Sequence, residues 1–263
     1  MSRVSAKNIF KLIDMANDEL PIEQQFINDL KASIEKSQEC RKPSQTYKPS
    51  GMNCVRAMTY QVLGVEPDNN KSSYQLIGIC ESGTDRHIRI QKAIENMKTI
   101  LGVDCEYIDV AKFVQQRNIQ DLEIVGQSGM ECKLYHKKLN MSFMCDGIIK
   151  YKSKYFIFEF KTETANKWYK RTDVDPSHYN QATAYSIAFG IDRVLFLYES
   201  RDTLDKKAFL FTVTDDMKQN LIGKIDYCDS YVKKLKAPPK PQNVSKKACS
   251  YCNYRNQCGK DMY

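Results

Sequence analysis

Two carboxylates and a lysine lie close together between residues 140 and 161, in a stretch rich in strand-forming residues. Side chains of a strand alternate between its two faces, so Glu159 and Lys161 share one face and Phe160 points to the other. Asp146 precedes them, and a hairpin would bring it within reach of Glu159. Carboxylates bind divalent cations, and a nearby ammonium can help to position a water. The pattern predicts a metal site for hydrolysis; the alternative is an ordinary strand end with solvated charges.

Cysteines form a second group of residues able to hold a metal. Cys249, Cys252 and Cys258 form a Cys-x2-Cys-x5-Cys run near the C-terminus. A cluster held by four thiolates needs one more ligand, and the best candidate is Cys54 at the start of a short amphipathic helix. The alternative for Cys54 is a buried small residue. The scattered cysteines are expected to be core or surface thiols: Cys40, Cys80, Cys105, Cys132, Cys145 and Cys228.

Three further polar side chains are predicted to lie on helices. His87 follows Gly83 by one turn, and a glycine inside a helix costs roughly 1 kcal/mol relative to alanine, which favours something packing close to its backbone. Gln181 and Tyr185 are four residues apart and therefore share a helix face. The alternatives are a structural histidine and two polar residues on a solvated face.

A basic and aromatic segment follows the candidate catalytic strand. Lys167, Trp168, Lys170 and Arg171 are nearly contiguous. Such a loop could stack on bases and contact phosphates. The alternative is an ordinary surface loop whose tryptophan covers the core.

Hydrophobic periodicity and turn residues predict the elements that position these side chains. The expected helices are 4–17, 22–37, 54–63, 73–100, 109–116, 177–189 and 215–236. The expected strands are 130–136, 140–151, 154–161, 193–199 and 207–213. A loop at 41–53 and a proline-rich basic linker at 237–247 connect them, and 103–124 is otherwise expected to be loop.

Composition narrows the class of protein. The 263 residues can bury a substantial core, and the net charge of +8 suits a polyanionic partner without requiring one. No apolar run reaches membrane-spanning length, and the N-terminal residues lack the apolar core of a signal peptide. We therefore expect a soluble, cytoplasmic protein that has no membrane association and whose cysteines are reduced or bind metal rather than forming disulfides.

Taken together, these motifs resemble a known family. Their order and approximate spacing are similar to those of the RecB-type branch of the PD-(D/E)-x-K nucleases, over roughly residues 50–263. The positions that carry the resemblance are Gly83-x-x-x-His87, Asp146, Glu159-x-Lys161 and Gln181-x-x-x-Tyr185. The four cysteines resemble those of the iron–sulfur subset, which includes the AddB nuclease domain and small nucleases of CRISPR adaptation and of phages. Val55 departs from the proline usual after the first cluster cysteine.

The resemblance implies an α/β fold and a set of domains. A restriction-endonuclease-like core, a mixed central sheet flanked by helices, would span residues 51–236. A helical segment at 1–50 would precede it, and the basic linker and cysteine region at 237–263 would follow.

The resemblance also implies roles for individual residues. Asp146, Glu159, the backbone carbonyl of Phe160 and His87 would bind Mn²⁺ or Mg²⁺. Lys161 would orient the attacking water or help to deprotonate it. Gln181 and Tyr185 would line the site.

The four cysteines would hold a [4Fe–4S] cluster, with a structural Zn²⁺ as the competing occupant. One cysteine far upstream of three clustered ones favours the iron–sulfur cluster.

The implied activity is that of a metal-dependent DNA nuclease, most simply an exonuclease on single-stranded ends, in recombination, repair, replication or CRISPR-type DNA processing. The chain has no Gly-x-x-x-x-Gly-Lys-Ser/Thr motif, so translocation would require a helicase, recombinase or integrase-type partner. The alternatives are a non-catalytic DNA-binding module of the same fold and a nuclease that acts on RNA.

Overall fold

The computed structural model describes residues 20–37, 44–68, 73–128, 131–242 and 246–260. These residues form two compact units. The first contains residues 20–37 and 73–82, and the second contains the other described residues. The predicted helix at 4–17 lies outside the described residues.

The first unit contains α2 (Ile22–Lys36) and the beginning of α4 (Tyr74–Leu101). The predicted helix at 22–37 is confirmed. The carboxylate of Glu35 accepts a hydrogen bond from the backbone N–H of Tyr74 at 3.0 Å, and the ammonium of Lys31 lies 5.2 Å from the centre of the Tyr74 ring. These contacts join α2 to the start of α4.

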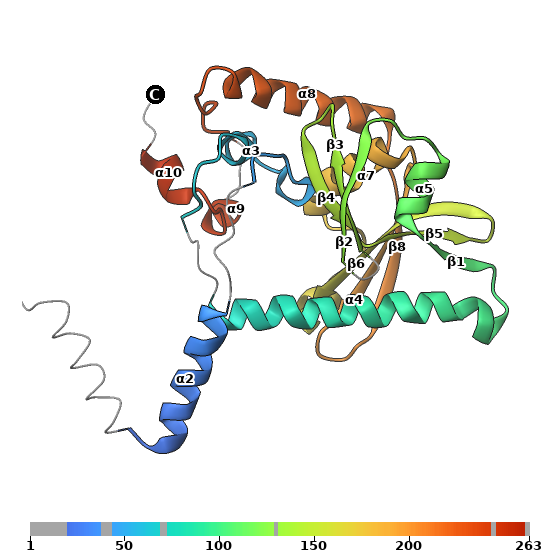
Figure 1. Ribbon diagram of the computed structural model, residues 1–263, viewed down its shortest axis with the longest axis horizontal. Helices are drawn as coiled ribbons and strands as arrows, with labels where there is room; N and C mark the ends of the chain where they lie inside the picture. The colour runs from blue at the N-terminus through green and yellow to red at the C-terminus, as the bar shows by residue number, and fades with distance from the viewer. Residues whose placement is uncertain (1–19, 38–43, 69–72, 129–130, 243–245, 261–263) are drawn as a thin grey trace, which may run out of the picture. The chain divides into compact units, whose positions relative to one another are not determined.

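The second unit is built on two sheets (Figure 1). The five-stranded sheet has the order β1-β5-β6-β7-β8, with β6 and β7 parallel and the other pairs antiparallel. Its strands are β1 (Cys105–Ile108), β5 (Gly147–Tyr151), β6 (Lys154–Glu163), β7 (Arg193–Ser200) and β8 (Lys206–Thr212). The antiparallel three-stranded sheet consists of β2 (Leu122–Ser128), β3 (Glu131–His136) and β4 (Met141–Cys145).

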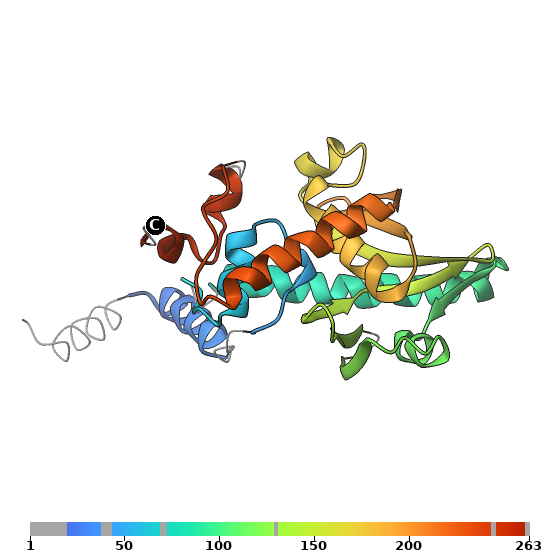
Figure 2. The same ribbon diagram turned by 90° about the horizontal axis from the view of Figure 1, so that it is seen from above.

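Helices flank the five-stranded sheet. In chain order, the described α-helices of the second unit are α3 (Val55–Val62), the rest of α4, α5 (Val110–Gln116), α6 (Ala165–Tyr169), α7 (Tyr179–Phe189), α8 (Asp215–Val232), α9 (Lys246–Ser250) and α10 (Arg255–Lys260). Short 3₁₀ turns lie at η1 (Pro49–Gly51) and η2 (Pro176–His178). In Figure 2, α8 lies alongside α3 and α7, with which it packs. None of the described helices combines the length and hydrophobicity needed to cross a membrane.

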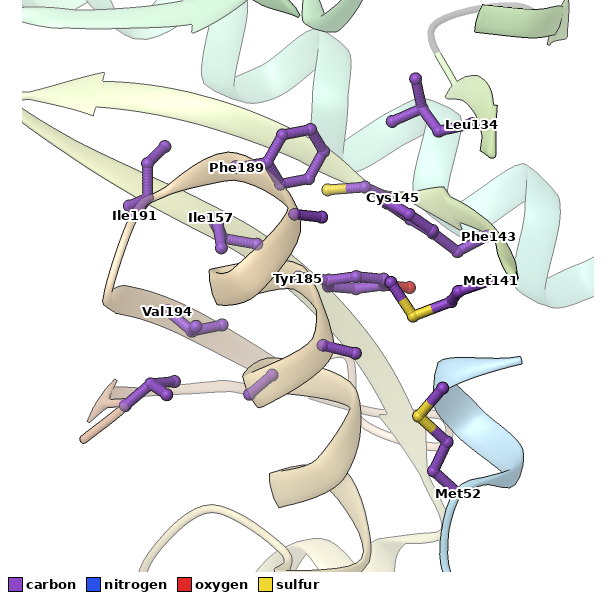
Figure 3. Close-up of a cluster of buried hydrophobic side chains, with 14 of the residues drawn as sticks. Met52, Leu134, Met141, Phe143, Cys145, Ile157, Tyr185, Phe189, Ile191 and Val194 are labelled. Atoms are coloured by element: carbon purple, nitrogen blue, oxygen red, sulfur yellow. The ribbon is translucent and has the colours of Figure 1, made fainter. Parts of the chain in front are cut away.

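The alternation predicted for β6 is confirmed by its packing. Ile157 belongs to the main core with α7, and Phe158 and Phe160 belong to a smaller cluster with Ile90 of α4. In the main core, Tyr185 and Phe189 project from α7 toward the strand β4 (Figure 3). The predicted fold class, a mixed central sheet flanked by helices, is therefore confirmed.

The elements differ from prediction in several places. The single strand expected at 140–151 is two strands in different sheets, β4 and β5, which are separated by Asp146. The strand β1 replaces part of the loop expected at 103–124, because four residues at a sheet edge are too few to show a period. The helix α6, with only five residues, lies in the expected basic loop, and α8 ends at Val232 rather than at residue 236.

Candidate active site

Asp146 lies at the point where the chain leaves one sheet for the other. Its backbone carbonyl accepts hydrogen bonds from Gln91 Nε2 at 2.9 Å and from the hydroxyl of Tyr107. Its carboxylate Oδ2 accepts from the backbone N–H of Phe160 at 2.7 Å. These three donors hold the Asp146 carboxylate beside the end of β6.

Gly147 permits the contact between Tyr107 and Asp146. A Cβ atom at Gly147 would overlap the hydroxyl of Tyr107, so a side chain there would displace the tyrosine. The Asp-Gly dipeptide therefore combines the candidate ligand Asp146 with a glycine, whose lack of a side chain leaves space for Tyr107 to hold Asp146 in position.

Glu159 is fully buried, and its two oxygens have different surroundings. Oε2 lies 2.7 Å from Lys161 Nζ and accepts a hydrogen bond from Gln181 Nε2 at 3.3 Å. Oε1 is buried and has no hydrogen-bond partner among the described residues. Burial, and then the charge of Asp146, raise the pKa of Glu159. A buried carboxylate oxygen without a donor is costly unless another group neutralises it.

Lys161 carries a charge that this arrangement stabilises. Burial lowers the pKa of Lys161, but the charges of Glu159 and Asp146 outweigh this effect, so the pKa lies above its usual value. Its ammonium also donates to Gln181 Oε1 at 3.2 Å. At neutral pH Lys161 is therefore a proton donor held beside the carboxylates and a poor base.

Gln181 and Tyr185 are both buried on α7, so the solvated-face alternative is wrong for this pair. Gln181 Nε2 donates to the hydroxyl of Tyr185 at 3.0 Å, and that hydroxyl donates to the backbone carbonyl of Met144 at 2.8 Å. The chain of hydrogen bonds links the Glu159–Lys161 pair to the end of β4.

His87 extends from α4 toward the same place. Its Nδ1 lies 3.3 Å from Asp146 Oδ1, and its ring packs edge-on against Phe160 with centroids 5.0 Å apart. The close packing predicted at Gly83 is wrong, because no described atom comes within 4 Å of the position of a Cβ there.

The residues present fit a divalent cation by their chemistry. Two carboxylates and an imidazole suit Mg²⁺ or Mn²⁺, and the unsatisfied Oε1 of Glu159 is an oxygen that such an ion would neutralise. As placed, no three His, Cys, Asp or Glu side chains in the described part of the chain are arranged to enclose an ion. The contribution of the Phe160 carbonyl stays a prediction.

The four predicted cluster cysteines line one cavity of about 470 Å³. Burial raises the pKa of Cys252, the N–H of Tyr254 opposes this, and the charges of Cys54, Cys258 and Cys249 raise it further. As placed, no three of these four thiols are arranged to enclose an ion. Four thiols around one cavity fit the donor set of an iron–sulfur cluster or zinc.

Backbone contacts fasten the cysteine region to the segment that follows α3. Asp68 donates its N–H to the carbonyl of Asn253 at 2.6 Å and accepts from the N–H of Asn256 through Oδ2 at 2.6 Å. Of the scattered cysteines, Cys80 is exposed and four are buried, whereas Cys40 lies outside the described residues. The buried four are Cys105, Cys132, Cys145 and Cys228.

The basic and aromatic segment is mostly engaged in internal contacts. Trp168 is buried and donates its Nε1 proton to the carbonyl of Tyr198 at 3.2 Å, as in the alternative that it covers the core. Lys167 and Arg171 each pair with the carboxylate of Glu163, at 2.9 and 2.7 Å. Their pairing also extends to Asp175, and Lys170 is exposed.

Sequence reasoning missed the residues that act through the backbone of Asp146. Gln91 and Tyr107 carry no signal of their own, since their types are common in helices and strands. Gly147 had one usable signal, its position directly after the candidate carboxylate.

No family model and no curated protein sequence matches the chain. Among solved structures, the crystal structure of SSO0001 is similar with a TM-score of 0.42 and 12% identity, covering 92% of this chain and 98% of that one. The alkaline exonuclease LHK-Exo from Laribacter hongkongensis is similar with a TM-score of 0.37 and 9% identity, covering 78% and 93%. Neither similarity decides the function. The geometry of the site must do so.

Proposed function

We propose that the chain is a metal-dependent nuclease that hydrolyses phosphodiester bonds of DNA. The observation that supports this most is Glu159, a fully buried carboxylate with one oxygen held by Lys161 and the other left without a partner among the described residues. Asp146 and His87 lie beside it. A structural ion pair would not need a buried carboxylate oxygen that is left without a donor.

In this proposal Asp146, Glu159, His87 and the Phe160 carbonyl hold the cation. A divalent ion supplies a water of lowered pKa and neutralises charge on the scissile phosphate. Lys161, as an ammonium, donates a hydrogen bond to the water or to a phosphate oxygen and offsets the charge that develops during attack.

Gln181 and Tyr185 serve as positioning residues. Gln181 contacts both Glu159 Oε2 and Lys161 Nζ, so its amide sets the distance between the two. Tyr185 fixes the rotamer of Gln181 through its hydroxyl.

The four cysteines, in the same proposal, hold a [4Fe–4S] cluster with a structural role, and Zn²⁺ is the alternative. Their common cavity supports either occupant. The single upstream cysteine and the C-terminal triplet favour the cluster.

We further propose that the substrate is a single strand or a single-stranded end and that the enzyme is an exonuclease. The net charge of +8 is compatible with a polyanionic substrate. Any translocation along DNA comes from a helicase, recombinase or integrase-type partner.

The proposal is tested with anaerobically purified protein and end-labelled single-stranded DNA, double-stranded DNA and matched RNA, with Mn²⁺, Mg²⁺ or chelator. We expect shortening of single-stranded DNA that depends on the metal, in a sample whose visible spectrum has a broad absorbance from the cluster. Colourless, active protein would favour zinc. Binding without cleavage of every substrate in every metal would favour the non-catalytic DNA-binding module, and cleavage confined to RNA would change the substrate class.

A further inference from the structure

A second cavity, of about 330 Å³, opens beside Lys161. It is bordered by the end of β6, by α6, by η2 and by the residue that follows β7. Its lining residues are Lys161, Thr162, Glu163, Thr164, Lys167, His178 and Arg201. Because Lys161 also contacts Glu159, the cavity and the candidate active site share this lysine.

The charged side chains that line this cavity differ in whether they form an ion pair with another side chain of the protein. Lys161 pairs with Glu159 at 2.7 Å, and Lys167 pairs with Glu163 at 2.9 Å. Glu163 is further neutralised by a second cation, Arg171, whose Nη2 lies 2.7 Å from Oε1. The carboxylate that lines the cavity is therefore already occupied by protein cations.

Arg201 is the exception. Across the residues that the structure describes, its guanidinium has no ion pair or hydrogen bond, and its Nε is buried without an acceptor. The adjacent acid, Asp202, forms no ion pair with Arg201 and instead accepts a hydrogen bond from the N–H of Ala165 through Oδ2 at 2.8 Å. A buried N–H donor on a permanent cation calls for an anionic acceptor.

The backbone of Arg201 is held firmly. Its N–H donates to the carbonyl of Glu163 at 2.7 Å, and its carbonyl accepts from Arg86 Nη2 at 3.1 Å. Thr162 and Thr164 also line the cavity, and each carries a hydroxyl group, which is a neutral donor. The cavity thus combines a guanidinium on a firmly held backbone with hydroxyl-bearing side chains, which is the chemistry of a phosphate site.

We propose that this cavity binds a phosphate group of the substrate strand next to the one that is cleaved, with Arg201 as its principal donor. The inference rests on the proposed nuclease function. The neighbouring phosphate is assigned to this cavity because Lys161 both lines the cavity and contacts Glu159 of the candidate active site. The phosphate is either an internal phosphodiester or a terminal monophosphate. Both present non-bridging phosphate oxygens to a guanidinium, so the choice of substrate must distinguish them.

The test measures binding without cleavage. Full-length wild-type protein, Arg201→Gln, Arg201→Lys and the control Arg193→Gln are titrated in chelator with oligonucleotides that carry a 5′-phosphate, a 3′-phosphate or hydroxyl ends. Arg193 begins the strand that Arg201 follows, so the control removes a guanidinium from the opposite end of β7. Melting curves verify that each variant is folded.

We expect Arg201→Gln to weaken binding about tenfold and to reduce the salt-dependence slope by about 0.7, and Arg201→Lys to recover part of the loss. An equal loss of affinity for the oligonucleotides with a 5′-phosphate, a 3′-phosphate and hydroxyl ends identifies an internal phosphate. A loss confined to one phosphorylated end identifies a terminal phosphate and the polarity of the strand. Equal affinities of Arg201→Gln, Arg193→Gln and wild type, at every end, would overturn the proposal.

A second measurement uses wild-type protein and so does not depend on the variant folding. Phenylglyoxal modification followed by mass spectrometry should show that an oligonucleotide protects Arg201 but not Arg193. Equal modification of Arg201 with and without oligonucleotide would reject the site. Neither measurement requires catalysis, so a protein that binds but does not cleave would refute the nuclease proposal while leaving the cavity result readable.

Discussion

Asp146 depends on neighbours that are not themselves reactive. Its backbone carbonyl is held by Gln91 and Tyr107, and its carboxylate by the N–H of Phe160. The position of the candidate ligand is therefore set by donors from α4, β1 and β6.

Gly147→Ala tests this dependence. The added methyl group would overlap the Tyr107 hydroxyl and force it away from Asp146, so we expect a loss of about 1–3 kcal/mol in unfolding free energy and at least tenfold lower cleavage. Chemical denaturation and the cleavage assay measure the two effects. Gly223→Ala is the matched control, since Gly223 lies in α8 and, apart from the local helix backbone, no described atom lies within 4 Å of its Cβ position, so it should be neutral or slightly stabilising. Equal behaviour of the two variants would remove the proposed role of Gly147.

Lys161→Ala tests the catalytic assignment. Removing the ammonium takes away the donor beside Glu159 but little packing, so we expect the fold and DNA binding to persist while cleavage falls roughly 100-fold or more. Single-turnover cleavage and a binding titration separate the two. Lys154→Ala, at the exposed other end of β6, should cleave normally. Normal cleavage by Lys161→Ala would overturn the assignment.

At the scale of elements, the sequence allowed the catalytic strand to be predicted but not the sheet switch before it. The alternation of Ile157 and Phe158 between two apolar faces is visible in the residue types, and the structure confirms it. The break at Asp146 is invisible, because strand propensity continues across it and only tertiary pairing separates β4 from β5.

The side chains of the candidate site could be predicted because they are of residue types that bind metals, carry charge or form hydrogen bonds. His87, Asp146, Glu159, Lys161 and Gln181 are brought together. The residues that support them, such as Tyr107 and Gln91, could not be predicted, because they bond to a backbone carbonyl that no sequence pattern marks. Trp168 was ambiguous for a related reason: a tryptophan beside basic residues suits either a core or a stacking surface.

The position of α4 depends on an ion cluster at β7. Glu199 is fully buried and lies 2.9 Å from Arg86 Nη1 and 2.7 Å from Arg89 Nη2, and these two arginines bracket His87 on the helix. Lys206 completes the cluster at 3.1 Å. The cluster joins the helix that carries His87 to the sheet that carries Glu159.

Glu199→Gln should loosen this attachment. We expect a loss of about 3 kcal/mol in unfolding free energy, since one partner of a buried ion cluster is removed, together with weaker metal-dependent cleavage because His87 loses its support. Urea unfolding and metal titration measure these effects. Glu106→Gln, on the exposed side of β1, is the control. An unchanged metal dependence would show that the cluster stabilises the fold without positioning His87.

The turn before α7 should make stability pH-dependent. Burial, and then the charge of Lys161, lower the pKa of His178 to about 4 from 6.5. The unfolded chain therefore binds the proton first, so this contribution is present above pH 6.5 and falls as the pH decreases toward 4. We expect His178→Gln to lose stability less steeply over that interval, measured by urea midpoints at several pH values. His136, whose pKa burial also lowers, supplies a contribution that this variant retains. Parallel pH profiles for variant and wild type would contradict the expectation.

At the scale of the whole molecule, the cysteine cavity joins residues that are far apart in sequence. Cys54 precedes the sheets, and the C-terminal triplet follows them. A cluster bound there closes a loop that contains the whole candidate active site. Such a crosslink stabilises the fold chiefly by restricting the unfolded chain.

Cys54→Ser should therefore lower the stability of the whole fold and not only change the surroundings of residue 54. We expect loss of the cluster absorbance and a decrease of roughly 4 kcal/mol in the unfolding free energy of the metal-loaded protein, by analogy with a crosslink over a long loop. Visible spectra, metal analysis and denaturation measure this. The exposed Cys80, replaced by serine, is the control. Equal stability and metal content in the two variants would exclude Cys54 as a ligand.

The break between β4 and β5 has a consequence for the newly made protein. Asp146 is placed by the five-stranded sheet and α4, because Gly147 pairs with Phe158 and the three donors to Asp146 come from α4, β1 and β6. A newly made chain in which β5 and β6 have paired therefore already has Asp146 beside Glu159, whether or not the three-stranded sheet is complete. The contact of Tyr185 with the carbonyl of Met144 has to wait for β4.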